Sequence, residues 1–383
     1  MTAIRQIDTR AKSDVQQFVQ FPYRLYSEHP QWVPPPLVDA KAYLNRSKHP
    51  FYEHSDGDFF IVERGGEVVG RLAAIENRPY NQHHEKKQAQ FYFFECVEDY
   101  SVAEMLFERA FEWARTRGLT QIVGPKGMGP LDGYGLQVEG FEHRQMMTMM
   151  NYNYPYYPQF VEKLGFRKEV DFVSHYIHTP DFIVPERVHR IARRVRQRGI
   201  LDVLDLQNKR QLRTWAKRIG KAYNSAFVNN WEYYPLSERE IDYVLENVLL
   251  LADPRMIKLI LHGEQVVGFL FAFPDVSSAL QRAKGKLFPT GIFDLLLEMR
   301  RTKWVALNGA GILPEFQGRG GNALLYSEME KSLLGSRFIH ADLTQVAESA
   351  VQMRNDLDMP QFLYPSEMRV WSGWAAANAA GVL

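Results

Sequence analysis

The chain has 383 residues, of which 45% are apolar and 24% are charged, values that are ordinary for a soluble globular protein. Its 46 basic and 45 acidic residues leave a formal net charge of +1, so the charge balance gives no sign of a nucleic-acid partner. The length exceeds what one compact core usually holds and therefore predicts two domains.

Cysteine content and hydropathy bear on the compartment. Cys96 is the single cysteine, which excludes an internal disulfide framework and favours a reducing compartment. The first residues lack the apolar core of a signal peptide, and no run reaches the roughly 18 apolar residues that a membrane helix needs. We therefore expect a cytoplasmic protein, and no metal site is predicted.

A β-hairpin signature occurs twice, about half the chain apart. Residues 59–76 and 256–275 each combine a β-branched and aromatic run, a turn with glycine, and a second apolar run that opens with Val-Val-Gly. A strand, a helix and a second strand follow in each half, at 90–97, 103–117 and 121–123 and again at 304–313, 322–334 and 338–343. This order predicts an α/β fold with a mixed (α+β) sheet, present as two tandem copies at 1–180 and 181–383.

Tyrosines cluster near the end of the first half. Tyr154, Tyr156 and Tyr157 follow a stretch with four glycines at 127–135, and together they suggest an aromatic-lined pocket for a small or lipid-like substrate. The following residues also have the spacing of a helix that packs on a sheet, so a structural role stays open.

Two further segments have basic or amphipathic patterns. The helix predicted at 187–198 carries several arginines, which either form a solvated face or contact an anionic membrane surface or a coenzyme phosphate. The segment 277–303 is an insertion between the second hairpin and the next strand. It either packs against the core or covers a greasy substrate.

The most informative stretch is Pro-Glu-Phe-Gln-Gly-Arg-Gly-Gly-Asn at 314–322, between a predicted strand and a helix with Asn322 as its N-cap. Three glycines allow a tight turn whose N–H groups face one ligand, and the helix N-terminus adds a positive dipole end. The turn therefore predicts phosphate binding, although its spacing is neither the Walker nor the Rossmann type. The first half has Glu98 to Ser101 at the corresponding place, without glycine, so we expect no pyrophosphate there.

Gln317 to Asn322 resembles the Q-x-x-G-x-G/A pyrophosphate loop of the GCN5-related N-acetyltransferases (GNAT), which bind acyl-coenzyme A (acyl-CoA). Phrases spread over most of the chain are similar to one tandem subfamily, the YghO-like and bacterial ceramide synthase-like acyltransferases: Gly124-Pro125, Glu139-Gly140-Phe141, the tyrosine run, Tyr223 to Phe227 and Phe273-Pro274-Asp275. The resemblance implies two tandem GNAT folds. It also implies that the second half holds acyl-CoA through Ile312, Leu313, Gln317, Gly318, Arg319, Gly320, Gly321 and Asn322.

The implied reaction is acyl transfer from acyl-CoA to an amine, which is small or lipid-like. Asn230 and Trp231 match a phrase of the subfamily and join the tyrosines as candidate acceptor contacts. The strand before the loop has no acidic side chain to take the proton of the amine. Asp342 on the next strand is the first candidate base, followed by His340 and Glu348. Cys96 lies in the half without the loop, so we expect direct attack by the amine in a ternary complex and no acyl-cysteine.

Two other functions stay open. The missing acidic base motivates a catalytically silent acyl-CoA binder that acts as a sensor or scaffold. A Fem-like aminoacyl transferase also has two such domains, but the near-neutral charge and the phosphate loop speak against a charged tRNA as its donor.

Overall fold

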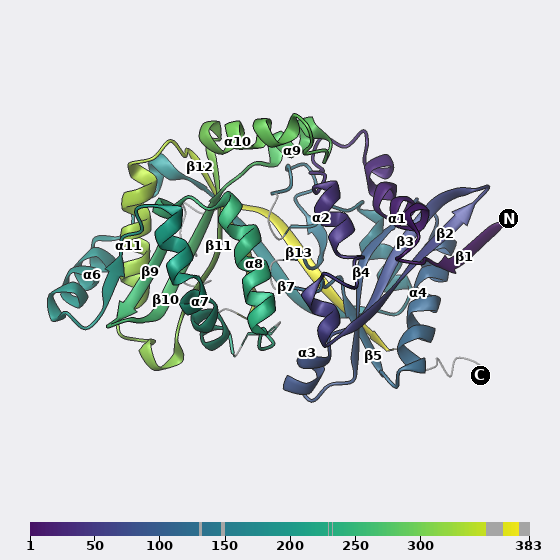
Figure 1. The fold of residues 1–383 in the computed structure, drawn as a ribbon, viewed down its shortest axis with the longest axis horizontal. Coiled ribbons are helices and arrows are strands. Elements are labelled where there is room, and N and C mark those ends of the chain that lie inside the picture. The colour runs from purple at the N-terminus through teal and green to yellow at the C-terminus, as the bar shows by residue number, and fades with distance from the viewer. Residues whose placement is uncertain (130–131, 147–149, 229, 232, 350–362, 375–383) are drawn as a thin grey trace.

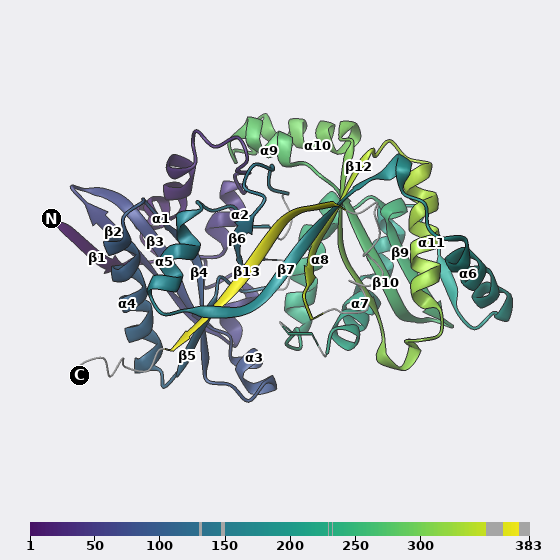
Figure 2. The same cartoon turned by 180° about the vertical axis from the view of Figure 1, so that it is seen from behind.

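The computed structural model describes residues 1–129, 132–146, 150–228, 230–231, 233–349 and 363–374. In these residues the strands form one mixed sheet in the order β1-β2-β3-β4-β5-β13-β7-β12-β11-β10-β9-β8, and β6 pairs with β13. Figures 1 and 2 show the sheet running through the length of the molecule, with helices on both faces.

The strands are β1 (Thr2–Gln6), β2 (Asp56–Arg64), β3 (Glu67–Glu76), β4 (Gln88–Cys96), β5 (Gln121–Gly124), β6 (Leu136–Glu139), β7 (Arg167–His178), β8 (Asp202–Leu204), β9 (Ile257–His262), β10 (Gln265–Pro274), β11 (Trp304–Ile312), β12 (His340–Ala347) and β13 (Leu363–Trp374). The α-helices are α1 (Lys12–Leu25), α2 (Leu37–Ala42), α3 (Arg78–His83), α4 (Tyr100–Thr116), α5 (Tyr156–Lys163), α6 (Glu186–Arg198), α7 (Lys209–Ala226), α8 (Glu238–Leu251), α9 (Ser277–Ala283), α10 (Gly291–Arg301) and α11 (Gly321–Leu334). Short 3-10 turns lie at η1 (Pro50–Glu53), η2 (Thr179–Asp181), η3 (Pro254–Met256) and η4 (Pro314–Phe316).

The order of elements predicted for the repeat is confirmed, and the two halves also share a β-bulge. Hairpins β2–β3 and β9–β10 are each followed by a strand, a helix and a strand that runs parallel to the first. The strand that follows the hairpin in each half carries a β-bulge, at Phe93 in β4 and at Gly309 in β11, and both residues have positive φ, 52° and 87°. A bulge re-aims the strand that contains it, so both halves turn the ends of their central strands in the same way.

In the second half the two faces of the sheet are covered by different helices. Gly268 and Ile312 face α11, because a Cβ on Gly321 at the start of α11 would lie 2.6 Å from the Cδ1 of Ile312. The next residue, Phe269, points the other way and packs against Tyr223 and Phe227 near the end of α7. Alternation along β10 thus separates a face with α6 and α11 from a face with α7 to α10.

The last described strand lies far from its neighbours in sequence. β13 is inserted between β5 and β7 and pairs antiparallel with both, with Trp371 opposite Gly124 of β5 (Figure 2). Its Trp371 is buried in the apolar core formed by α4 and the first strands. The sheet of the first half is therefore completed by residues from the end of the chain, while the proposed division near residue 180 stays a prediction.

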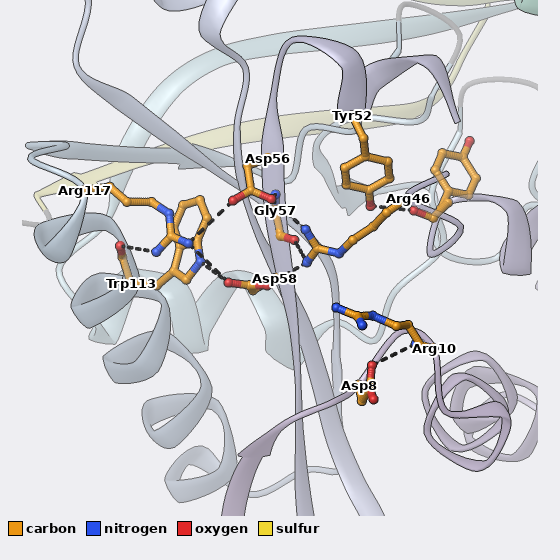
Figure 3. Close-up of polar contacts among 10 residues, drawn as sticks. Asp8, Arg10, Arg46, Tyr52, Asp56, Gly57, Asp58, Trp113 and Arg117 are labelled. Carbon is orange, nitrogen blue, oxygen red and sulfur yellow. Dashed lines mark hydrogen bonds and ion pairs between the residues drawn. The ribbon is translucent and has the colours of Figure 1, made fainter. Parts of the chain in front are cut away.

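A charged cluster fixes the start of β2 in the first half (Figure 3). Arg46, in the segment after α2, contacts Asp56 at 2.6 Å and Asp58 at 2.7 Å. Arg117 at the end of α4 reaches Asp58 from the other side at 3.3 Å, and the indole N–H of Trp113 donates to the same carboxylate at 2.8 Å. The carboxylate of Asp58, whose side chain is 14% exposed, thus connects two separate segments to the sheet and fixes the start of β2.

Trp371→Ala tests whether β13 belongs to the core of the first half. Removing a large buried ring leaves a cavity, so we expect the free energy of unfolding to fall by about 3–5 kcal/mol. Chemical denaturation followed by intrinsic fluorescence measures this value, and Ser372→Ala on the same strand serves as the control. Equal stability of the two variants would contradict the insertion of β13 in this core.

Candidate active site

The turn between β11 and α11 has the geometry of an anion site. Gly318 and Gly320 have φ of 72° and 85°, which favours glycine at both positions. α11 begins at Gly321 with Gly320 as its N-cap, so the prediction of Asn322 as N-cap was wrong and Asn322 lies in the first turn. In the described chain, the N–H groups of residues 318–322 donate to no protein acceptor, and Arg319 is exposed beside them. Such N–H groups at a helix start attract anions.

The predicted basic helix lies beside this turn. Val195 and Ile191 of α6 are so near Gly320 that a Cβ there would come within 2.7 Å and 3.0 Å of their methyl groups. Two polar contacts hold α6 along α11: Arg196 pairs with Glu328 at 2.6 Å, and the Nε2 of His189 lies 2.9 Å from the carboxyl group of Glu330. The helix is thus packed on one face, and its exposed arginines near the C-terminal end, Arg194 and Arg198, lie on the side of the turn.

The strand before the turn has an open edge. β11 and β12 pair in parallel from Trp304 beside His340 to Leu307 beside Leu343. Beyond that point the bulge at residues 308–309 follows, while β10 continues to pair with β11 as far as Ile312. Within the described residues, no strand pairs with the other edge of 309–312. Free backbone groups on this edge can hydrogen-bond an extended ligand that runs toward the turn.

The first half is closed at the same place. The start of α4 is capped by Asp99, which accepts from the N–H of Ser101 at 3.0 Å and pairs with Arg64 at 2.6 Å. The hydroxyl of Tyr157 accepts from the N–H of Cys96 at 2.8 Å, and Tyr156 donates to the carbonyl of Cys96 at 2.8 Å. A carboxylate and two tyrosines thus bond the backbone groups of the first half at this place, and the absence of pyrophosphate binding there stays a prediction.

A cavity of about 540 Å³ lies on the sheet face away from α11, between the two halves. Most of its walls are apolar or aromatic. The second half contributes α8, Phe273, Leu280, Leu287, Leu295 and Asn308, and the first half contributes the α1–α2 region, Tyr92, Phe93, Met128 and Tyr152. Asn308 lies at the bulge, so the cavity meets the open edge of β11 there.

Asp342 lies on the cavity face of the sheet. Its neighbour across the strands is Ala306, which is opposite Phe273, a residue of the cavity wall. Asp342 is buried, and its Oδ1 meets no hydrogen-bond donor among the described residues. Burial, and then the nearby carboxylate of Asp275, raise the pKa of Asp342 to about 7. A carboxyl group with this pKa can exchange a proton near neutral pH.

The other two candidate bases have different surroundings. The Nδ1 atom of His340 is 2.7 Å from the hydroxyl of Tyr176, its ring stacks on Trp304, and burial lowers its pKa. Glu348 pairs with Lys168 at 2.7 Å and accepts from the N–H of Asp171 at 3.0 Å, at the far end of β12. None of the three candidate bases, Asp342 included, lines the cavity.

The predicted acceptor residues lie away from the cavity walls. Tyr154 donates to the carbonyl of Leu25 at 2.8 Å and stacks on Tyr156. The indole N–H of Trp231 reaches Glu169 at 3.4 Å, and Asn230 donates its N–H to Phe227 at 2.8 Å in a turn. The Tyr154 hydroxyl, the Trp231 indole N–H and the Asn230 backbone N–H are thus each bonded within the protein. The role of these residues in substrate binding stays a prediction.

Sequence reasoning missed this cavity. Its walls come from α2, α8 and the α9–α10 segment, which are far apart in the chain, and no motif marks them. Asn308 had one signal, since it is the polar residue before Gly309 in an otherwise apolar strand. The insertion at 277–303 was predicted either to pack or to cover a substrate, and Leu280, Leu287 and Leu295 do line the cavity.

Known proteins share this architecture. No protein-family model matches the chain. It is 25% identical to protein YghO of Escherichia coli over 353 residues, 91% of this chain and 89% of that protein. It is 27% identical to the bacterial ceramide synthase of Caulobacter vibrioides over 316 residues, 81% of each chain.

Solved structures agree on the fold. A tandem GNAT protein from the clavulanic acid biosynthesis pathway superposes with a TM-score of 0.56 at 12% identity, over 98% of this chain and 99% of that one. A GCN5-related N-acetyltransferase from Sphaerobacter thermophilus gives a TM-score of 0.51 at 10% identity, over 98% and 96% of the two chains. The predicted tandem GNAT fold is therefore confirmed.

Asp342→Asn tests the buried carboxyl group without reference to any reaction. The folded pKa of about 7 lies above the value near 4 of an unfolded aspartate, so the wild type loses stability as the pH rises from about 4 to 7 and stays at that lower level above it. The asparagine variant does not ionise, so its stability does not fall between pH 4 and 7 for this reason. We expect its stability relative to the wild type to be greater at pH 8 than at pH 5 in thermal melts. The same difference at both pH values would mean that Asp342 ionises normally.

Proposed function

We propose that this tandem GNAT-fold chain, similar to YghO and to bacterial ceramide synthase, transfers an acyl group from acyl-CoA to an amine. The observation that carries the proposal is the pairing of an anion-binding turn with an open strand edge in one half only. A coenzyme with a pyrophosphate at one end and a thioester at the other matches that combination.

The coenzyme is assigned to the second half. N–H groups of residues 318–322 would bind the pyrophosphate, with Arg319 and the α6 arginines Arg194 and Arg198 as neighbouring cations. The extended part of the coenzyme would follow the open edge of β11. The thioester would then lie near Asn308, where the edge meets the cavity.

The cavity is assigned to the acceptor and the acyl chain. Its apolar walls suit a long-chain substrate, and a relative at 27% identity is named a bacterial ceramide synthase. We therefore propose a lipid-like, sphingoid-type amine as the acceptor. Ceramide formation joins an acyl group and such an amine through an amide bond.

The chemistry is a direct attack in a ternary complex. The amine nitrogen forms a bond to the thioester carbonyl carbon while a backbone N–H of β11 stabilises the developing oxyanion. Asp342, ionised, takes the proton that the amine loses. The carbon–sulfur bond breaks, the thiolate leaves and is protonated, and the products are an amide and coenzyme A. Cys96 is buried in the closed half, which supports a route without an acyl-cysteine.

Thiol release from acyl-CoA of several chain lengths, in the presence of a panel of amines that includes a long-chain amino alcohol, tests this function. We expect release that depends on the amine and rises with pH through about 7, because only ionised Asp342 accepts a proton. Asp342→Asn should lower kcat about 10²–10⁴-fold, whereas the exposed Asp205→Asn should not.

The rival functions predict other results. Tight coenzyme binding without turnover of any amine in the panel would favour a sensor or scaffold. If coenzyme A did not bind at all, the proposal of an acyl-CoA site in the second half would be overturned. That result would favour a Fem-like transferase with a charged-tRNA donor.

Gly318→Ala tests the turn, and Gly263→Ala is its matched control. Both glycines have positive φ, 72° and 60°, and a Cβ at either meets no protein atom within 4 Å. The backbone strain, about 1–2 kcal/mol, is therefore similar for the two variants. We expect only Gly318→Ala to weaken coenzyme A binding, by about tenfold in calorimetric titration, because its methyl group intrudes where phosphate approaches the backbone. Equal affinities of the two variants would exclude this turn as the pyrophosphate site.

A further inference from the structure

The α9–α10 segment exposes a group of large apolar side chains to solvent. Phe288 is 89% exposed, Phe293 72%, Leu296 45% and Leu297 39%. We call these four residues the apolar patch. Exposed apolar side chains are common singly, but a group of this size on one segment marks an interaction surface.

The patch follows the geometry of α10. Phe293, Leu296, Leu297 and Arg300 are spaced i, i+3, i+4 and i+7 and so lie on one stripe of the helix. Leu295 points the opposite way, is 4% exposed and lines the cavity. α10 is thus apolar on two opposite sides. The side with Leu295 is buried in the protein, whereas the side with Phe293, Leu296 and Leu297 faces solvent.

Basic residues surround the patch. The segment 277–303 contains six basic and two acidic side chains, an excess of four positive charges. Both acidic residues, Asp294 and Glu298, pair with one of the basic ones, Arg282. Among the residues that the structure describes, the exposed Lys284, Lys286, Arg300, Arg301 and Lys303 form no ion pair. Apolar side chains beside unpaired cations complement an anionic lipid surface.

The patch is also continuous with the cavity. Leu287, next to Phe288, lines the cavity, and so do Val38 of α2 and Leu250 of α8, which are themselves exposed. The N–H of Leu37 donates to the carbonyl of Gly285 at 2.9 Å, so α2 touches the loop that carries Phe288. Figure 1 shows α9 and α10 along one edge of the molecule, above both halves. A surface held against this edge therefore meets the rim of the cavity.

We propose that the apolar patch docks this protein on an anionic lipid bilayer, with the rim of the cavity turned toward the lipid. No helix in the described part of the chain is long and apolar enough to span a bilayer, so the contact is peripheral. The proposal rests on the exposed surface and holds whether or not the chain is a transferase.

Co-sedimentation of the full chain with vesicles tests the proposal, in the absence of acyl-CoA. Vesicles of phosphatidylcholine alone are compared with vesicles that also contain phosphatidylglycerol, each at low and high salt. We expect binding to the anionic vesicles, weakened by salt and by Arg300→Gln with Arg301→Gln. Phe293→Ser with Leu297→Ser should lower the partition coefficient at least about tenfold.

The matched control is Ile183→Ser with Leu334→Ser, which removes two apolar side chains that are 70% and 60% exposed elsewhere. Retained vesicle binding in the control supports the proposal. Absence of binding by the wild type, or equal losses in both double variants, would overturn it. So would a dimer in light scattering that dissociates in Phe293→Ser/Leu297→Ser without vesicle binding, because the patch would then belong to a second copy of the chain.

Discussion

The end of the parallel pairing between β11 and β12 is the constraint on which the candidate site depends. The two strands stay together through Leu307 and Leu343, and the bulge at Gly309 then turns β11 away while β10 keeps it in the sheet. A strand held on one edge and free on the other is a rigid template for an extended ligand. The turn at Gly318 and Gly320 lies at one end of that template and the cavity at Asn308 lies at the other.

The two halves share a bulged strand but differ in the groups that surround it. Both carry the bulge, but in the first half Tyr157 satisfies the N–H of Cys96 and Asp99 caps the following helix. The polar groups that a ligand would otherwise satisfy are thereby bonded within the protein. That leaves the first half free to supply walls of the cavity, through the α1–α2 region and the end of β4.

Local patterns predicted most of the fold and only part of the site. The hairpins and the glycine turn depend on short-range periodicity and turn chemistry, so residues 59–76, 256–275 and 314–322 were sufficient to predict them. The position of β13 depends on pairing with β7 and β5, which lie roughly 200 and 250 residues earlier in the sequence, and no local pattern encodes such pairing. The cavity depends on packing among α2, α8 and α10. The Oδ1 of Asp342 is buried without a hydrogen-bond donor among the described residues only once the sheet has assembled, so the sequence gives no sign of it.

The insertion of β13 also has a consequence for synthesis of the chain. β5 and β7 belong to the first half, yet β13, the strand that hydrogen-bonds to both, follows β12 of the second half in the chain. Until β13 leaves the ribosome, the two strands present unpaired edges and the core around α4 lacks Trp371. The first half therefore cannot complete its folding while the second half is being made, and the two halves reach their native state together.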